Sequence, residues 1–413
     1  MKRLLISSTE PHCQRQSPEL RDQSMKTQVA IIGSGPAGLM LGLLLRQAGV
    51  EAVIVERQTQ DHVLSRIRAG VLETTTTDIL HDLDIADRMR SEGLPHDGFH
   101  LADGERLIRI DVKALTGKPV MVYGQTEVTK DLIDAAPSRN LEIIWEAGDV
   151  KLHDIETDAP FVTYKKYGTE YRIDARFIAG CDGFHGPSRK AIPVSAAREY
   201  EKVYPFGWLG VLADVPPCNA ELIYANHARG FALASMRSKM RSRYYVQVPL
   251  TENIDDWSDK KFWDELCRRL PPEAAAKVVR GPTLEKSIAP LRSFVFEPMR
   301  FGSLMLAGDA AHIVPPTGAK GLNLAASDVR YLARALITWF KDNNIDAIAA
   351  YSQTALSRVW KSERFSWQLT MLMHRFPDDG PFDRRVQIAE LDYIASSEAA
   401  QRVIAENYVG LPL

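Results

Sequence analysis

The chain has 413 residues, of which 51 are basic and 53 acidic, and 45% of its residues are hydrophobic. This length predicts two or three subdomains with separate cores. The formal net charge of −2 gives no field to hold a polyanion, so we expect no nucleic acid partner. The four cysteines lie far apart and form no CxxC pair, which argues against a disulfide framework or a zinc site and favours a cytoplasmic protein.

We expect residues 1–24 to be a disordered polar extension, because the apolar run after its basic start is too short for a secretory signal. The stretch 27–45 carries no charge, but glycines and a proline interrupt its middle. It is therefore predicted to form a strand, a turn and a helix, and no membrane partner is expected.

A βαβ unit is predicted directly after this extension. Residues 28–32 are an apolar strand, residues 39–48 a helix and residues 52–55 a second strand. This order starts a mostly parallel sheet, so the fold class is α/β with a Rossmann-like domain.

The turn of this unit carries Gly33, Gly35 and Gly38 in the pattern GxGxxG, and Glu56 ends the second strand. Glycines at these places let the backbone approach a pyrophosphate at the helix N-terminus, and the glutamate can accept hydrogen bonds from ribose hydroxyls. A glycine turn that binds nothing is the alternative. The motif predicts a dinucleotide, which at this point is NAD or FAD.

Two aspartates follow buried strands further along the chain. Asp182 stands in Gly-Cys-Asp-Gly after the apolar residues 177–179, and Asp309 stands in Gly-Asp-Ala-Ala-His after residues 304–307. Each motif alone is also compatible with an ordinary strand-end turn. The proline-rich loop 315–323 then leads into a predicted helix, whose N-terminus would place partial positive charge beside a flavin. A loop that merely caps the helix is the alternative.

The middle of the chain changes to strand-like segments with turn signals, which predicts an antiparallel sheet in a second domain. Ser235 and Arg237 fall on one face of a predicted strand, and Arg243 and Tyr245 fall on one face of the next. Such donors suit bidentate recognition of a carboxylate, although a solvated sheet face has the same pattern. Helical spacing over 325–340 and 347–373 predicts a helical C-terminal region.

The glycine turn and the two aspartate motifs together resemble the three signatures of the flavoprotein aromatic hydroxylases. Because a nicotinamide dehydrogenase needs neither aspartate motif, the resemblance implies FAD as the cofactor. It also implies a monooxygenase that uses NAD(P)H and molecular oxygen, through a flavin hydroperoxide, on a phenolic carboxylic acid expected to be 4-hydroxybenzoate. Longer strings extend the likeness over nearly the whole chain from Met25: residues 66–73, 123–129, 204–210, 222–227, 241–248 and 406–410.

The resemblance implies a role for several residues around the substrate. Tyr224 and the carbonyl of Pro316 would meet the phenol oxygen, Tyr408 would stand behind Tyr224, and His96 would end a proton relay to solvent. Each tyrosine could instead be a core aromatic with a satisfied hydroxyl. The substrate carboxylate would be held by Ser235, Arg237 and Tyr245.

The resemblance also assigns residues to the two nucleotides. Only one GxGxxG is present, so the nicotinamide donor is expected to visit the surface. His62 replaces the family's usual tyrosine, which leaves the choice between NADPH and NADH open. FAD or its surroundings would be contacted by Arg68, Gln125, Asp182, Arg243, Asp309 and Asn323. The nicotinamide nucleotide would be contacted by Arg57, Gln58, His185 and Arg292.

Other classes of function are less consistent with the sequence. His96 and His100 are four residues apart, but the Asp-Gly between them predicts a turn and no third ligand is clustered with them, so no metal is expected. The halogenase pattern Trp-x-Trp-x-x-Pro is absent. A flavin reductase and a binding protein without flavin are the remaining alternatives.

The expected division of the chain follows from these assignments. An FAD-binding domain is expected over 25–198, a substrate-binding antiparallel sheet over 199–292, and a flavin-contacting loop with a helical region over 293–413. The resemblance implies that the helical region forms a homodimer.

Overall fold

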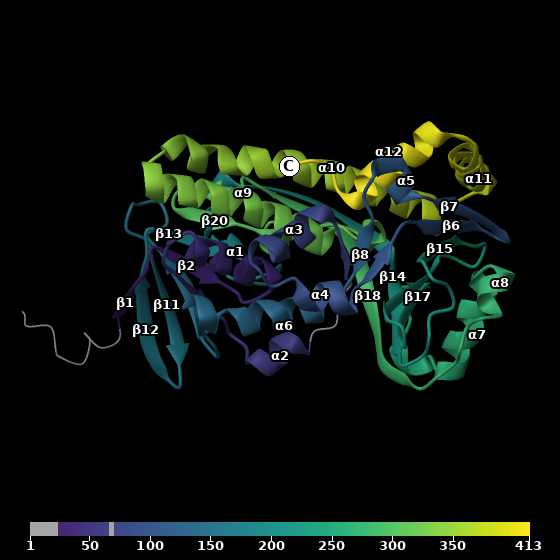
Figure 1. The fold of residues 1–413 in the computed structure, drawn as a ribbon, viewed down its shortest axis with the longest axis horizontal. Helices are drawn as coiled ribbons and strands as arrows, with labels where there is room; N and C mark the ends of the chain where they lie inside the picture. The colour runs from purple at the N-terminus through teal and green to yellow at the C-terminus, as the bar shows by residue number, and fades with distance from the viewer. Residues whose placement is uncertain (1–23, 66–69) are drawn as a thin grey trace, which may run out of the picture.

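The computed structural model describes residues 24–65 and 70–413. Arg68 and residues 1–23 therefore lie outside the described residues. The fold is α/β, and two large sheets stand side by side along the long axis of the molecule (Figure 1).

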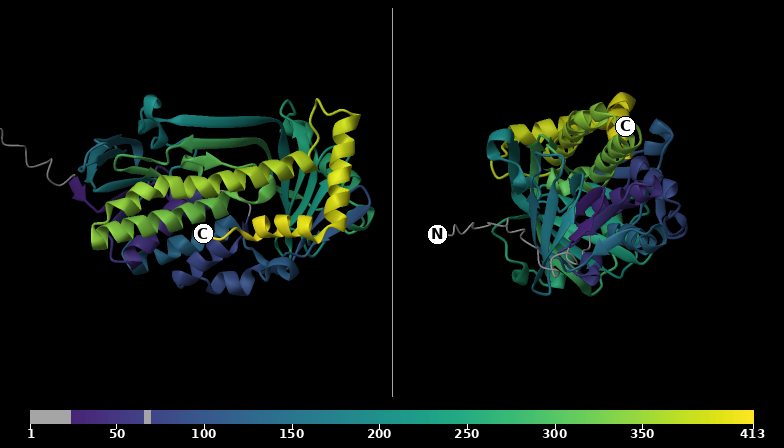
Figure 2. Two further views of the ribbon diagram at one scale, coloured as in Figure 1. Left: turned by 90° about the horizontal axis from the view of Figure 1, so that it is seen from above. Right: turned by 90° about the vertical axis from the view of Figure 1, so that its left-hand side faces the viewer.

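Two long antiparallel helices run above the first of these sheets (Figure 1). Helix α9 is Gly321–Asp342 and helix α10 is Ile345–Met373, and the two pack against each other (Figure 2). The predicted helices over 325–340 and 347–373 are confirmed, and both begin earlier than the apolar spacing indicates.

The first sheet has the order β19-β20-β13-β2-β3-β9 and is parallel apart from the edge strand β19. Every residue of β2, β3 and β13 is buried, as expected of parallel strands that are covered on both faces. The strands are β2 Val29–Ile32, β3 Ala52–Val55, β9 Glu142–Ile144, β13 Phe177–Gly180, β19 Arg300–Phe301 and β20 Leu304–Leu306.

Helix α1, Pro36–Gln47, connects β2 to β3 and completes the predicted βαβ unit. It begins before the predicted start at residue 39, because proline is favoured in the first turn of a helix. Its buried side chains, among them Leu39, Leu41 and Leu43, belong to the core that the first sheet shares with α9.

The second sheet has the order β21-β18-β14-β17-β16-β15-β6-β7. Its described strands pair antiparallel, except that β15 runs parallel to β6. The strands are β6 Phe99–Asp103, β7 Arg106–Ile110, β14 Arg198–Ala213, β15 Ile223–Asn226, β16 Ala232–Ser238, β17 Arg241–Pro249, β18 Thr283–Glu297 and β21 His312–Ile313.

Smaller elements complete the fold. The order β1-β12-β11-β10 forms one small sheet and β4-β8-β5 another. Their strands are β1 Ser24–Lys26, β4 Val71–Leu72, β5 Leu94–His96, β8 Val120–Val122, β10 Gly148–His153, β11 Phe161–Lys166 and β12 Thr169–Asp174. The other helices are α2 Gln60–Leu64, α3 Thr74–Asp82, α4 Asp87–Glu92, α5 Val112–Thr116, α6 Gln125–Ala135, α7 Asp259–Arg269, α8 Pro272–Ala275, α11 Pro381–Ser396 and α12 Glu398–Val409.

The two sheets do not follow the predicted division of the chain. Strands β6 and β7 come from the predicted range 25–198 but belong to the second sheet, and β18 crosses the expected boundary at 292. Strand β20, from the predicted range 293–413, belongs to the first sheet. Ser24, the last residue of the predicted extension, pairs with Arg172 as part of β1. Local patterns could not reveal these pairings because the partners are far apart in sequence.

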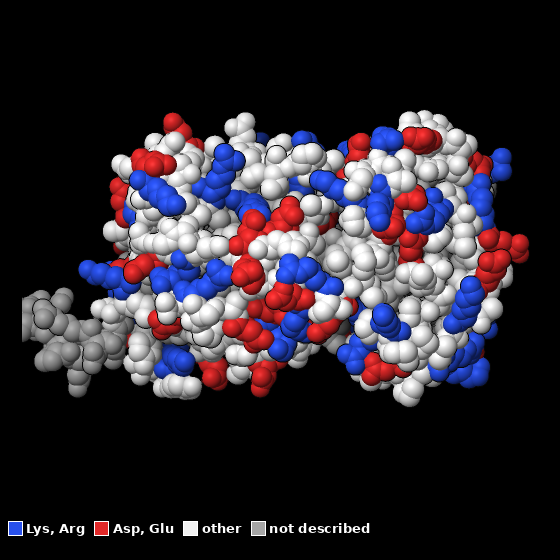
Figure 3. All heavy atoms as spheres, in the orientation of Figure 1, with Lys and Arg blue, Asp and Glu red and all other residues white. Residues whose placement is uncertain are grey.

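The charge on the surface and the apolar character of the helices bear on possible partners. Basic and acidic side chains alternate over the face in Figure 3, which has no continuous basic patch. Among the described residues, no helix has both the length and the apolar character needed to span a bilayer.

Candidate active site

The glycine turn lies where β2 meets α1. Gly33 has φ +99°, and a Cβ added to it would lie 2.5 Å from the carbonyl oxygen of Cys181, so this position requires glycine. At Gly35 an added Cβ would meet nothing within 4 Å, and no side chain caps the start of α1 there. The helix therefore opens toward free space with backbone N–H groups that suit an anion.

Glu56 is buried at the end of β3. Its Oε2 accepts hydrogen bonds from the backbone N–H of Ser34 at 2.8 Å and from the Ser34 hydroxyl at 3.0 Å. Its Oε1 accepts one from the N–H of Gln58 at 2.8 Å. These bonds fix the carboxylate beside the glycine turn, and Oε1, which accepts only one of them, has lone-pair capacity left for a ribose hydroxyl.

A cleft of about 470 Å³ opens over this carboxylate and is lined by Gly33, Glu56 and Asp182. Asp182 follows β13, and its Oδ2 accepts the N–H of Ser188 at 2.8 Å. Within the described chain its buried Oδ1 has no hydrogen-bond partner. Burial raises the pKa of the Asp182 carboxyl. The cleft thus contains an acceptor that the protein itself leaves unsatisfied, which fits a hydroxyl-rich ligand.

Asp309 lies in a short 3-10 turn that follows β20, and its side chain is exposed. Asn323 is different, although it was also predicted to contact the cofactor. Its Oδ1 accepts from the Glu73 N–H and the Thr76 hydroxyl, and its Nδ2 donates to the carbonyls of Val71 and Ala319. The carboxamide therefore has no hydrogen-bonding capacity left for FAD, and Asn323 instead fastens the start of α9 to the β4–α3 turn.

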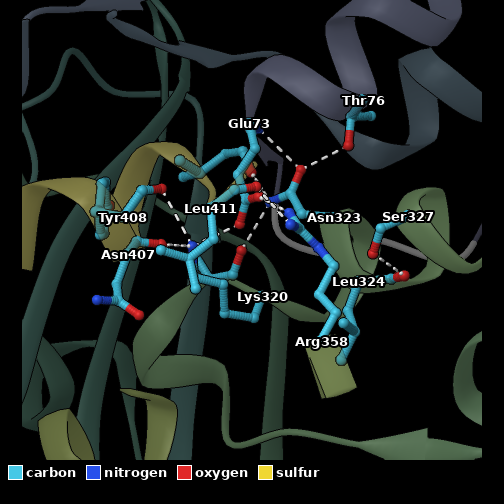
Figure 4. A network of polar contacts seen from close by, with 12 residues as sticks. Glu73, Thr76, Lys320, Asn323, Leu324, Ser327, Arg358, Asn407, Tyr408 and Leu411 are labelled. Atoms are coloured by element: carbon cyan, nitrogen blue, oxygen red, sulfur yellow. Dashed lines mark hydrogen bonds and ion pairs between the residues drawn. The ribbon is translucent and has the colours of Figure 1, made fainter. Parts of the chain in front are cut away.

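A buried ionic cluster, which no sequence motif indicated, supports the same helix start (Figure 4). Lys320 Nζ lies 2.5 Å from Glu73 Oε1, and Arg358 Nη2 lies 3.3 Å from Glu73 Oε2. Lys320 also donates to the carbonyls of Asn407 and Tyr408, and Arg358 donates to the carbonyl of Leu411. The cluster joins the loop before α9 to α10 and to the C-terminus. Lys320, which belongs to the proline-rich loop, is thereby held as a buried basic side chain at the N-cap of α9.

The predicted substrate residues meet on the second sheet. Tyr224 pairs with Leu233, which pairs with Tyr245, and Ser235 pairs with Arg243. Paired residues project from the same face, and so do residues two apart along a strand. The side chains of these residues therefore share one face across β15, β16 and β17, and this includes Arg243 and Tyr245, for which alternation along the strand predicted a common face.

Arg237 completes the set from a β-bulge at the end of β16. Its guanidinium lies next to the Tyr245 side chain and donates from Nη1 to the Met236 carbonyl at 2.9 Å. Burial lowers the pKa of Arg237, and in the described chain its Nε has no partner. A Cβ added to Gly124, just before α6, would lie 4.0 Å from Arg237 Cδ, so Gln125 starts its helix beside this arginine.

Two predicted contacts of the substrate need qualification. The Ser235 hydroxyl donates to the backbone carbonyl of Arg243 at 2.7 Å, so it must rotate before it can donate to a carboxylate. The Pro316 carbonyl accepts the Ala319 N–H at 3.0 Å, which leaves one lone pair for a phenol. Arg243 forms an ion pair with Glu285 at 3.1 Å.

Tyr224 and Tyr408 form the predicted pair, with their hydroxyl oxygens 3.0 Å apart. Phe99 stacks on Tyr408 with ring centroids 4.1 Å apart and meets Tyr224 edge-on at 5.6 Å. Burial raises the pKa of Tyr224 to about 12 and that of Tyr408 well above its ordinary value. Both phenols are therefore neutral donors at physiological pH.

His96 is buried, and burial lowers its pKa. Its Nδ1 has no hydrogen-bond partner among the described residues. No hydrogen bond recorded for those residues joins His96 to Tyr224 or Tyr408, so the last link of the proton relay stays a prediction. The described chain has no group of three or more His, Cys, Asp or Glu residues placed to hold a metal ion.

Two of the four residues predicted for the nicotinamide nucleotide line the cleft that holds Glu56. Arg57 and His185 line it and are exposed. The Arg292 guanidinium lies 4.8 Å from the Phe184 ring, next to His185, and Arg292 also pairs with Glu201 at 3.3 Å. Gln58 contributes its backbone N–H to Glu56.

Comparisons with known proteins show the family of this chain and two of its relatives. A profile of the family described as FAD binding domain matches residues 26–366. The chain belongs to this FAD-binding family. It is 58% identical over 391 residues to a p-hydroxybenzoate hydroxylase of Acinetobacter baylyi, and the match covers 94% of this chain and 96% of that protein. It is 25% identical over 335 residues to a para-nitrophenol 4-monooxygenase of a Pseudomonas strain, covering 76% of this chain and 78% of that protein.

A solved structure also resembles this member of the FAD-binding family. It is a p-nitrophenol 4-monooxygenase from Pseudomonas putida, with a TM-score of 0.81 at 18% identity over 95% of this chain and 100% of that chain. At this identity the likeness shows the fold. The predictions of an α/β fold and of FAD as cofactor are confirmed. The open α1 terminus and the unsatisfied Asp182 oxygen fit that cofactor.

Proposed function

We propose that this FAD-dependent monooxygenase hydroxylates 4-hydroxybenzoate next to its phenol oxygen, using NAD(P)H and O₂, to give 3,4-dihydroxybenzoate. The observation that carries the proposal is the shared sheet face on which the Arg237–Tyr245 pair lies near the Tyr224–Tyr408 pair. One pair supplies a cation and a hydroxyl for a carboxylate, and the other supplies a hydroxyl for a phenol. The 58% identity to a p-hydroxybenzoate hydroxylase supports the same substrate.

Substrate binding would use both ends of this face. The Arg237 guanidinium holds the carboxylate as a fork, and Tyr245 and a rotated Ser235 hydroxyl add one donor each. The flat ring then extends toward Tyr224 and the Pro316 carbonyl. Because the Tyr224–Tyr408 pair is buried, its hydrogen bonds act in a medium of low dielectric constant and fix the orientation of the ring.

Proton control would fall to the two tyrosines. Tyr408 donates to Tyr224, so the Tyr224 hydroxyl is free to donate to the substrate oxygen. The raised pKa values of both tyrosines keep them protonated while the substrate phenol, with an ordinary pKa of about 10, loses its proton. A phenolate is electron-rich at the neighbouring ring carbon. Bound FAD, once reduced, supplies the activation of oxygen.

The cofactor would lie between the two sheets. Gly33, Gly35 and Gly38 at the start of α1 hold the pyrophosphate, and Glu56 and Asp182 hold ribose hydroxyls. Asp309 meets the ribityl chain. Gln125 and Arg243 approach the flavin from the substrate side. The start of α9, with buried Lys320 below it, supplies the positive field that favours a reduced, anionic flavin.

The electron donor would bind transiently at the exposed edge of the cleft. Arg57, His185, Gln58 and Arg292 are the contacts we assign to it. His62 leaves NADPH and NADH as alternatives, and steady-state rates with each donor in parallel distinguish them.

We also propose that the protein is a cytoplasmic homodimer. The separate cysteines support the compartment. The exposed apolar side chains of Phe382, Val386 and Tyr393 on α11 support a paired surface there. Light scattering of the purified full chain tests the dimer, and a monomeric mass contradicts it.

The decisive experiment measures NAD(P)H oxidation, product and ligand affinity together. 4-Hydroxybenzoate should accelerate oxidation and yield 3,4-dihydroxybenzoate. Arg237→Ala should weaken 4-hydroxybenzoate binding about 100-fold, with Arg237→Lys intermediate because it keeps the charge but loses the fork. Tyr224→Phe should bind nearly normally and divert reducing equivalents to hydrogen peroxide. Oxidation that is independent of the substrate and gives only peroxide contradicts the proposal.

A further inference from the structure

The turn that carries Asp309 packs closely between the N-terminal parts of α1 and α9. Gly308 has φ +63°, and a Cβ added to it would lie 3.2 Å from the Ala325 Cβ on α9 and 3.5 Å from the Ala37 Cβ on α1. The end of α1 that receives the pyrophosphate and the helix below the flavin loop therefore converge on one glycine. Any movement of this turn changes both parts of the cofactor site.

One buried side chain holds this turn in place. This residue is Asp328, which lies within α9. Its Oδ2 accepts a hydrogen bond from the Gly308 N–H at 2.9 Å. The same oxygen lies 2.5 Å from His312 Nε2. The side chains of Asp328 and His312 are 1% and 2% exposed, so solvent cannot replace either bond. In the described chain Asp328 Oδ1 has no hydrogen-bond partner, so Oδ2 makes both of these interactions.

His312 supplies the charge that makes this arrangement stable. Burial by itself lowers the pKa of His312, but the Asp328 carboxylate more than offsets that effect and the pKa of His312 is raised. A buried carboxylate without a cation would be costly, whereas a hydrogen-bonded pair is tolerated. His312 begins β21 directly after the turn, so the pair also closes the turn onto the second sheet.

We propose that Asp328 is a positioning residue, held by His312, that fixes the Gly308–Asp309 turn against α1 and so determines how tightly FAD is retained. The inference rests on FAD binding by this family. Asp328 does not touch the cofactor in this assignment. It acts through the backbone of Gly308, while Asp309 makes the contact.

The test measures FAD retention in the full-length holoenzyme by serial dilution, with released flavin followed by its fluorescence. Asp328→Ala should raise the dissociation constant of FAD at least tenfold, because the Gly308 N–H loses a charged acceptor. Asp328→Asn keeps one oxygen and should lie between the wild type and the alanine variant. At saturating FAD, Asp328→Asn should keep most of the wild-type kcat and its KM for 4-hydroxybenzoate.

Tyr351→Phe is the matched control. The Tyr351 hydroxyl is buried in the same core and donates to the Leu306 carbonyl at 2.7 Å, two residues before Gly308. Its loss should destabilise the fold but change the FAD dissociation constant less than twofold. Equal changes in Tyr351→Phe and Asp328→Asn, or unchanged retention in both Asp328 variants, would overturn the positioning role. Wild-type protein that binds no FAD would instead refute the proposed function.

Discussion

The buried ionic cluster at the start of α9 makes a strong prediction about stability. Glu73 is the carboxylate that faces both Lys320 and Arg358, and the three side chains are 3%, 4% and 7% exposed. In Glu73→Gln the shape is kept but the charge is lost. Two buried cations then have no counter-ion, and the amide N–H₂ of the new side chain faces a donor.

The expected cost follows from this burial. Breaking a buried ion pair by removing one partner costs about 3–5 kcal/mol, against a total stability of roughly 5–15 kcal/mol for a typical domain. Urea unfolding of the holoenzyme at a fixed, saturating FAD concentration measures the change. The double variant Glu73→Gln/Lys320→Met removes one unpaired cation and should recover part of the loss.

A surface pair serves as the control. Asp82 pairs with Arg330, and their side chains are 53% and 26% exposed. Asp82→Asn should therefore cost at most about 1 kcal/mol. If Glu73→Gln lowers the free energy of unfolding no more than this control does, the buried cations do not need Glu73 as a counter-ion, and the reasoning is refuted.

Two further predictions concern the substrate face and its support. A Cβ added to Gly210 would lie 2.7 Å from the Tyr245 ring, so Gly210→Ala should raise the KM for 4-hydroxybenzoate on the order of tenfold. An unchanged KM contradicts this. Burial raises the pKa of Glu363 from 4.5 to about 7, so the folded state binds a proton that the unfolded state releases. Stability from this group is present below pH 4.5 and falls by about 3 kcal/mol as the pH rises through 7. Glu363→Gln should therefore gain stability relative to wild type between pH 5 and pH 8, and a constant difference between the two proteins argues against it.

The parts of the site that the sequence predicted are those encoded within a few neighbouring residues. The glycine turn needs Gly33 because the backbone there has positive φ and lies against Cys181, just after β13. Such a position requires glycine, so it can be recognised in the sequence. Alternation likewise placed Arg243 and Tyr245 on one face of their strand, β17. The family resemblance then supplied the Tyr224–Tyr408 pair, which spacing alone would have left as core aromatics.

What the sequence did not reveal depends on partners that are distant in the chain. Lys320 and Glu73 are separated by 247 positions, and neither stands in a recognisable motif. Asn323 has the residue type expected of a cofactor contact, but its four bonds to the protein become visible only when α9 meets the β4–α3 turn. Hydrogen bonds within the protein, such as that of Ser235 to Arg243, are equally invisible in a sequence.

The interleaving of the two sheets has a consequence for how the chain is made. The second sheet needs β6, from the first third of the chain, beside β15, and it also needs β18, which ends at Glu297. A nascent chain that has emerged only to residue 198 can pair β6 with β7 but leaves its other edge without β15, and an unpaired strand edge is a template for aggregation. The second sheet can therefore be completed only after β21, at His312–Ile313, has been synthesised, and a single protease cut near residue 198 leaves neither fragment with the complete strands of a large sheet.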